Sequence, residues 1–153
     1  MTKPQSSSAW SLFLTLHANL IDAIERRLAD ANLPPLTWYD ALWALECAPE
    51  HRLRMHEFEQ RMVISRSNVT RLIDRLETAG LVRRERSDED RRGAFAVLTR
   101  EGGATRKRMW KIYERAIEDV FEAHLTTGEL RDAETIFRKL LDKHRAAVAA
   151  TAR

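Results

Sequence analysis

The side chains best suited to chemistry in this chain lie in the stretch SRSNVTRLIDRLETAG, residues 65–80 of 153. Hydroxyl, amide and guanidinium groups alternate there with an apolar stripe. Arginine can bind guanine through two parallel hydrogen bonds, asparagine can pair with adenine, and hydroxyl groups can bind phosphate oxygens. These side chains therefore suit a DNA duplex, although a capped helix with a solvated polar face has the same composition. The candidates are Ser65, Ser67, Asn68, Thr70, Arg71 and Arg75.

A second group of charged residues occupies the loop SDEDRRG between two expected strands, residues 81–86 and 94–98. Asp90 precedes Arg92 by two residues, so its carboxylate can orient that guanidinium through a charge-assisted hydrogen bond. An arginine held in this way gains most in a narrow, electronegative minor groove. We therefore expect Asp90, Arg91 and Arg92 to contact DNA; the alternative is a charged loop that only promotes solubility.

Hydrophobic periodicity predicts the elements that would position these groups. Apolar residues recur at intervals of three and four along several segments, which is the spacing of amphipathic helices. The sequence thus predicts a mainly α fold with a small β-hairpin wing. The expected helices span residues 10–28, 38–47, 56–62, 65–80, 100–124 and 126–148, and an edge strand is expected within residues 51–54.

Capping residues predict both ends of the helix at residues 65–80. Ser65 is expected to be the N-cap, with Ile64 and Val69 forming a hydrophobic staple around it. Gly80 is expected to adopt the left-handed conformation that closes a helix in a Schellman motif. The helix should therefore be stable in one fixed place.

Two further helices begin with capping pairs. Thr37 is followed by Asp40 at the start of the second expected helix, in a variant of the capping box. Thr126 is followed by Glu129 at the start of the last one, in the usual form of that motif. Both threonines are therefore expected to be N-caps.

The wing and the helix after it carry a recognisable motif. The run DRRGAFAVLTREG, residues 90–102, matches the pattern DxRxxxxxLTxxG, and the upstream run SRSNVTRLIDRLETAGLVRR is similar to the recognition helix and first wing strand of the same family. The chain resembles the MarR (multiple antibiotic resistance regulator) family, most strongly over residues 54–102. The resemblance implies a winged helix-turn-helix regulator of transcription. It implies major-groove contacts from Ser65, Ser67, Asn68, Thr70 and Arg71, and a minor-groove contact from Arg92.

The resemblance also implies a homodimer on double-stranded DNA. It implies one MarR-like domain over residues 1–153, with a DNA-binding lobe at 37–99 and dimerisation helices at 8–30 and 100–148. The apolar stripes of the outer helices, which exceed what a small winged domain needs to cover, favour a second copy, while a core shared within one chain is the alternative. Two recognition helices related by a two-fold axis would require an inverted-repeat operator with half-sites about one helical turn apart.

Aromatic side chains suggest a sensor site. Many relatives in this family lose DNA affinity when a small aromatic acid or phenol binds, and aromatic rings with an arginine suit a planar aromatic anion. The alternative is that the tryptophans belong to the core and that Asp40 acts only as a cap. The candidate ligand-binding residues are Trp10, His17, Trp38, Tyr39, Asp40, Trp43 and Arg52.

Several functional classes lack their signals in this sequence. No glycine-rich phosphate loop, nucleophile elbow or paired-histidine metal motif is present, so we expect no enzyme activity, cofactor or metal. The lone Cys47 is expected to be a buried, inert thiol. No apolar run is long enough to cross a bilayer and the start of the chain lacks a secretory signal pattern, so we expect a cytoplasmic protein without a membrane partner.

The charge distribution leaves one rival function. The formal net charge is only +3, but nine arginines and no lysine occur between residues 61 and 92. A winged domain that binds another protein through its exposed helices is the alternative to a DNA-binding regulator. The two differ in salt dependence, because phosphate binding weakens steeply as salt rises whereas an apolar protein contact does not.

Overall fold

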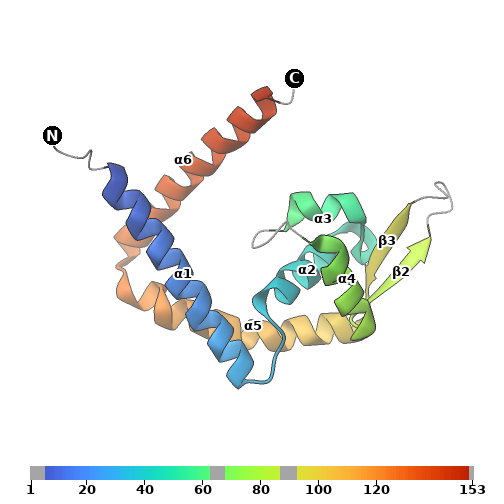
Figure 1. Cartoon of the computed structure of the whole chain (residues 1–153). Coiled ribbons are helices and arrows are strands. Elements are labelled where there is room, and N and C mark those ends of the chain that lie inside the picture. Colours follow the sequence, from blue (N-terminus) through green and yellow to red (C-terminus); the bar gives the residue numbers. More distant parts are fainter. Residues whose placement is uncertain (1–5, 63–67, 87–92, 152–153) are drawn as a thin grey trace. The chain divides into compact units, whose positions relative to one another are not determined.

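The computed structural model describes residues 6–62, 68–86 and 93–151. The chain divides into two compact units, Met1–Arg115 and Ala116–Arg153. Figure 1 shows the helices and strands along the chain. They are α1 (Ser6–Asp30), α2 (Leu36–Glu46), the short η1 (Pro49–His51), β1 (Arg52–Arg54), α3 (Met55–Arg61), α4 (Val69–Thr78), β2 (Val82–Arg86), β3 (Ala94–Leu98), α5 (Arg100–Val120), the short η2 (Glu122–His124) and α6 (Thr127–Thr151).

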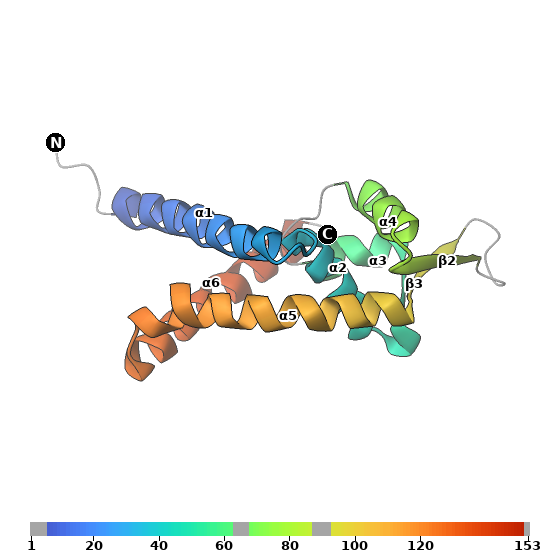
Figure 2. The ribbon, with the colours of Figure 1, turned by 90° about the horizontal axis from the view of Figure 1, so that it is seen from below.

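The strands form a small antiparallel sheet in the order β1-β3-β2. Leu53 of β1 and Arg84 of β2 both pair with Ala96 of β3, so these three residues form one row across the sheet. Leu53 and Ala96 are buried, which identifies the face of that row as the one that packs on the helices. The mainly α fold with a β-hairpin is confirmed, and the hairpin arm of β2 and β3 extends from the lobe in Figure 2.

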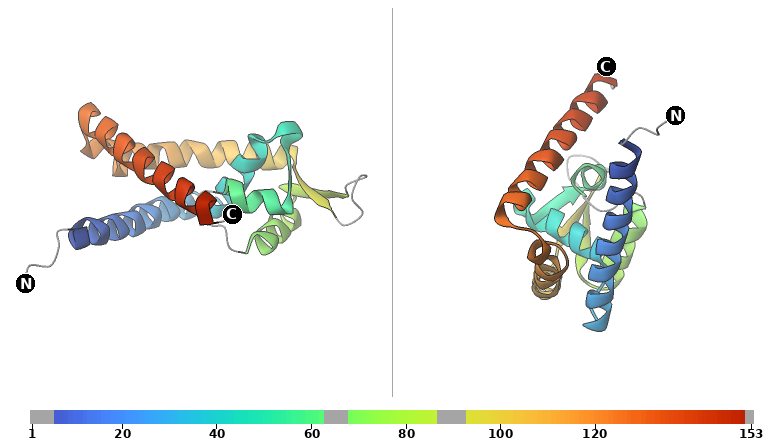
Figure 3. Two further views of the ribbon diagram at one scale, coloured as in Figure 1. Left: turned by 90° about the horizontal axis from the view of Figure 1, so that it is seen from above. Right: turned by 90° about the vertical axis from the view of Figure 1, so that its left-hand side faces the viewer.

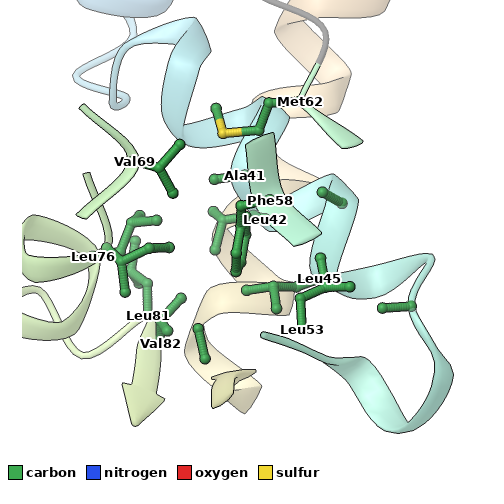
Figure 4. Close-up of a cluster of buried hydrophobic side chains, with 14 residues drawn as sticks. Ala41, Leu42, Leu45, Leu53, Phe58, Met62, Val69, Leu76, Leu81 and Val82 are labelled. Carbon is green, nitrogen blue, oxygen red and sulfur yellow. The ribbon is translucent and has the colours of Figure 1, made fainter. Parts of the chain in front are cut away.

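The core of the first unit joins α2, α3, α4 and the sheet. Leu42 and Leu45 of α2 and Phe58 of α3 are fully buried, and Figure 4 shows them together with Leu76 of α4. The burial of such side chains stabilises the fold by about 1.5–3 kcal/mol each. Trp43 of α2 is 45% exposed, so the alternative that the tryptophans belong to the core does not hold for it.

The start of α2 differs from the prediction. The helix begins at Leu36 with Pro35 in the N-cap position, so Thr37 lies inside the helix and is not its cap. The backbone N–H of Leu36 instead donates a hydrogen bond of 3.0 Å to Oε1 of Glu25 in α1. A carboxylate from another helix thus satisfies one of the free donors at this end. Asp40 is buried, so its role is not that of a surface cap.

The start of α4 also differs from the prediction. The helix begins at Val69, and Asn68 in the N-cap position has a φ of 58° and a ψ of 30°. Asparagine tolerates this left-handed conformation, but a right-handed helix cannot continue through it. The prediction that the helix begins after Ser65 is therefore wrong; Ser65 itself and Ile64 lie outside the described residues.

The end of α4 is the predicted Schellman motif. Gly80 has a φ of 73°, and its N–H donates to the carbonyl oxygen of Glu77 at 2.9 Å. The N–H of Leu81 donates to the carbonyl oxygen of Leu76 at 2.9 Å, and both leucine side chains are buried in the same cluster. These two bonds and the apolar contact close the helix.

The second unit contains the end of α5 and all of α6. Figure 3 shows α6 as a helix without a break. The predicted capping box is confirmed, because the N–H of Thr126 donates to Glu129 Oε2 at 2.8 Å and the N–H of Glu129 donates to Thr126 Oγ1 at 3.3 Å. The hydrogen bonds that the backbone N–H and the hydroxyl of Thr126 donate to the carboxylate lower the pKa of Glu129. The preceding helix ends at Val120, earlier than predicted.

Candidate nucleic-acid interface

One face of α4 is buried and the opposite face is exposed. Val69, Ile73 and Leu76 point into the core at intervals of four and three. The residues that the sequence places on the outer face are exposed, as predicted, so this ten-residue helix presents an amide, a hydroxyl and two guanidinium groups. These residues are Asn68, Thr70, Arg71 and Arg75. The other predicted contacts, Ser65, Ser67, Asp90, Arg91 and Arg92, lie outside the described residues.

The first wing strand is tied to α4 by Arg84. One terminal nitrogen of Arg84 lies 2.5 Å from Asp74 Oδ1, and the other lies 2.8 Å from Glu77 Oε2. The neighbouring Arg83 is paired instead with Glu85 of its own strand. The role of Arg84 is not evident from the sequence, because no local pattern signals a contact between residues ten positions apart.

The start of α5 is bound to the end of α4. The hydroxyl of Thr99 donates to the carbonyl oxygen of Gly80 at 2.8 Å, and the backbone N–H of Thr99 donates to the carbonyl oxygen of Leu81 at 3.1 Å. A Cβ atom at Gly102 would lie 2.1 Å from that Leu81 oxygen, so only glycine fits there. Thr99 and Gly102 thus hold the start of α5 against the end of α4, the helix that carries Arg71 on its exposed face.

The predicted ligand-binding residues fall into separate groups. Trp10 and His17 lie on α1 on either side of Phe13, with ring centroids 5.9 and 6.3 Å from it. Arg52 is paired with Glu50, and its guanidinium lies 4.8 Å from the centre of the Phe95 ring. Arg52 lines an open cavity of about 330 Å³ that none of the other predicted ligand residues lines. That cavity is lined by Pro49, Glu50, Arg52, Leu53, Glu57, Arg61 and Phe95.

An aromatic cluster surrounds Tyr39. Its ring lies 6.5 Å from that of Trp43, 6.0 Å from that of Trp110 and 5.2 Å from that of Tyr113. Burial is the main cause that raises the pKa of Tyr39. Burial, helped by the charge of Asp40, also raises the pKa of Tyr113. Trp38 is half-buried and packs against the main core of the lobe.

Arg106 of α5 supplies the positive charge beside this aromatic cluster. It is only 9% exposed, its guanidinium lies 5.2 Å from the centre of the Trp43 ring, and it is paired with Glu46 at the end of α2. A hydrogen bond from Arg106 partly offsets the burial that raises the pKa of Tyr39. The role of Arg106 is not evident from the sequence, since no signal distinguishes one basic residue from the others in a charged helical stretch.

Two helices expose large apolar side chains. Those of α1 are Trp10, Leu12, Phe13, Leu14 and Leu16, and those of α6 are Ile136, Phe137, Leu140, Leu141 and Val148. On α6 a cavity of about 390 Å³ lies beside this row, between Phe121, Phe137 and Leu141. Apolar faces of this length are typical of surfaces that another chain covers.

The structure also bears on Cys47, on metal binding and on membrane insertion. Cys47 is exposed, so the expectation of a buried thiol is wrong. It follows directly after α2, where the end of the helix leaves it at the surface. Among the described residues no group of histidine, cysteine and acidic side chains could hold a metal ion. Within the same ranges no helix has the length and apolar character needed to cross a membrane.

Comparison with known proteins identifies the family. A sequence model described as MarR family matches residues 31–93, which run from the turn before α2 to the end of the wing loop. The crystal structure of Sco3205, a MarR family transcriptional regulator from Streptomyces coelicolor, in complex with DNA, superposes with a TM-score of 0.83 at 29% identity, over 94% of this chain and 89% of that one. The chain belongs to the MarR family.

Curated MarR-like relatives agree with this assignment. The HTH-type transcriptional regulator PapX of Escherichia coli is 34% identical over 103 residues, which are 67% of this chain and 62% of PapX. The transcriptional repressor MprA of Escherichia coli K12 is 33% identical over 107 residues, which are 70% of this chain and 60% of MprA. The matched part of the chain thus spans about three fifths of the length of these MarR-like relatives.

Proposed function

We propose that this chain is a sequence-specific regulator of transcription that binds double-stranded DNA as a homodimer. The observation that carries the proposal is the outer face of α4, where Asn68, Thr70 and Arg71 stand exposed on a helix whose opposite side is locked into the core. Membership of the MarR family and the DNA complex of Sco3205 support it. The name of MprA, a transcriptional repressor, favours repression, and a regulatory role rather than an enzymatic one. Chromosomal DNA as the partner would place the protein in the cytoplasm.

In this proposal α4 enters the major groove with its N-terminal end first. Asn68, Thr70 and Arg71 lie in its first turn, where side chains reach base edges in a helix-turn-helix, and Arg75 lies one turn further on, close to the phosphate backbone. Bidentate recognition by Arg71 favours guanine. Asp90 and Arg91, which directly precede Arg92 in the sequence, would contact DNA beside it, and Arg92 would bind the adjacent minor groove.

The dimer in this proposal forms through the outer helices, residues 8–30 and 100–148. The apolar rows on α1 and α6 support it, since a second copy related by a two-fold axis would bury the same rows on both chains. Two copies of α4 would then meet an inverted repeat with half-sites about one helical turn apart. The lobe at residues 37–99 would be the part that binds DNA.

We further propose a small aromatic anion as a ligand that releases the DNA. The cluster of Tyr39, Trp43, Trp110 and Tyr113 supports this, because it offers several ring faces beside the guanidinium of Arg106. In this refined site Arg106 takes the place of Arg52 as the cation. Trp38, Asp40, Trp10 and His17 remain predicted members of the site.

Selection of binding sequences from a random duplex library, followed by titration, tests the proposal. We expect an inverted repeat to be enriched and to bind with a dissociation constant that rises steeply with salt, with a slope of log affinity against log salt of about −5 to −10. Random duplex of equal length is the control, and we expect it to bind at least about a thousandfold more weakly. Affinity that is equal for all duplexes or independent of salt would favour the protein-binding alternative.

A further inference from the structure

Arg84 of β2 makes three contacts with the recognition helix α4. Its side chain contacts Asp74 Oδ1 at 2.5 Å and Glu77 Oε2 at 2.8 Å, and its backbone N–H donates to Glu77 Oε1 at 3.1 Å. Both carboxylates therefore bind the same strand residue. The hydrogen bond from Arg84 to Asp74 is the main cause that raises the pKa of the guanidinium.

The position of Arg84 in the sheet explains how it reaches α4. It lies in one row with Leu53 and Ala96, on the face of the sheet that packs on the helices. Leu81 and Val82, which precede Arg84 in the chain, lie beside Leu76 of α4 in Figure 4, so an apolar contact and an ionic one join the same part of the chain to α4. Arg83 and Glu85, on either side of Arg84 in the strand, lie on the opposite face of the sheet and form an ion pair with each other.

These contacts change the expected roles of the charged groups. A carboxylate on a helix that faces DNA repels phosphates, and an exposed arginine beside it attracts them. Here the three groups satisfy one another, since a guanidinium bound by two carboxylates is held in a single geometry. Asp74 is thus paired with Arg84, and it is not an unpaired carboxylate beside Arg71 and Arg75.

We propose that Arg84 is a positioning residue for DNA binding, which holds the wing strand β2 at a fixed angle to the recognition helix through Asp74 and Glu77. The inference rests on the proposed function and adds to it a residue that need not touch DNA. The major-groove helix and the wing must contact the same duplex at once, so freedom between them costs affinity for a specific site. The two carboxylates strengthen DNA binding because they hold Arg84.

Neutralising these carboxylates separates the proposal from simple electrostatics by the sign of the effect. The variant Asp74→Asn/Glu77→Gln removes two negative charges close to DNA, and phosphate repulsion alone predicts tighter binding. We expect operator binding to weaken instead, by about three- to tenfold. Glu85→Gln is the matched control in the same strand, and we expect its operator affinity to stay equal or to rise.

A double-mutant cycle with Arg84→Gln completes the test. If Arg84 acts through the carboxylates, the triple variant binds the operator no more weakly than the weaker of its two parents. Additive effects, or tighter binding by Asp74→Asn/Glu77→Gln, would overturn the proposal. Affinity for random duplex distinguishes positioning from partial unfolding, because a smaller folded fraction lowers both affinities equally whereas a loose wing lowers operator affinity more. Failure of the unmodified protein to bind any operator would refute the proposed function, whereas the order of operator affinities among the variants tests the positioning role of Arg84 alone.

Discussion

Two adjacent glycines at the start of α5 should respond in opposite directions to alanine. At Gly103 a Cβ atom would meet only Leu98 Cδ2 at 3.9 Å, which is an ordinary contact. At Gly102 it would lie 2.1 Å from the Leu81 carbonyl oxygen and 2.9 Å from Leu98 Cδ1. Both positions are helical, so alanine gains the same helix propensity at each, about 0.5–1 kcal/mol. Gly103→Ala should therefore stabilise the protein.

The difference between the two variants isolates the cost of the close contact. The helix term cancels between them, and forcing a methyl group into packed backbone costs on the order of 1–3 kcal/mol. For a chain of this size that difference corresponds to roughly 2–12 °C in melting temperature. Thermal and urea unfolding followed by circular dichroism, at one fixed protein concentration, measures it. Equal stability of Gly102→Ala and Gly103→Ala would refute the close approach of α5 to the end of α4.

Three further predictions follow from the other surfaces. Leu140→Glu should weaken self-association roughly a hundredfold in sedimentation equilibrium, because it places a charge in an apolar interface, whereas Lys143→Glu on the same helix should not; an unchanged dimer would exclude this face. Because the pKa of Glu129 is lowered on folding, its cap stabilises the protein above pH 4.5, the ordinary pKa, and this stabilisation is lost as the pH falls through the lower folded-state pKa. Glu129→Gln should therefore make the melting temperature depend less on pH in that range. An unaltered pH profile would argue against the cap. Salicylate should quench tryptophan fluorescence and release the operator, and Arg106→Gln should abolish both effects; persistence of both would place the ligand elsewhere.

The parts of the fold that depend on local sequence were predictable. The spacing of Val69, Ile73 and Leu76 gave the buried face of α4, and Gly80 gave its end, because both signals lie within one turn or two of the chain. The capping box at Thr126 followed for the same reason. The outward direction of Arg71 then resulted from helical geometry alone.

The parts that depend on distant residues were not predictable from local patterns. Threonine is a common N-cap residue, but α2 begins at Leu36, before Thr37. The carboxylate of Glu25, eleven residues before Leu36, accepts the hydrogen bond from the Leu36 N–H. The N-cap of α4 is Asn68, in a left-handed conformation, and it lies three residues after the predicted cap, Ser65. Arg84 and Arg106 gain their roles only when a strand or helix is brought beside its partner, so one sequence does not distinguish them from other arginines.

Substitution of guanine by 7-deazaguanine in the selected operator tests the central claim most directly, because it removes a major-groove acceptor and leaves the minor groove and the phosphates unchanged. We predict that at least one such position in each half-site weakens binding of the unmodified protein by about five- to a hundredfold. The same substitution should have no further effect on Arg71→Ala, whose contact is already lost. Operator binding that is insensitive to every major-groove substitution would contradict the placement of α4 in that groove.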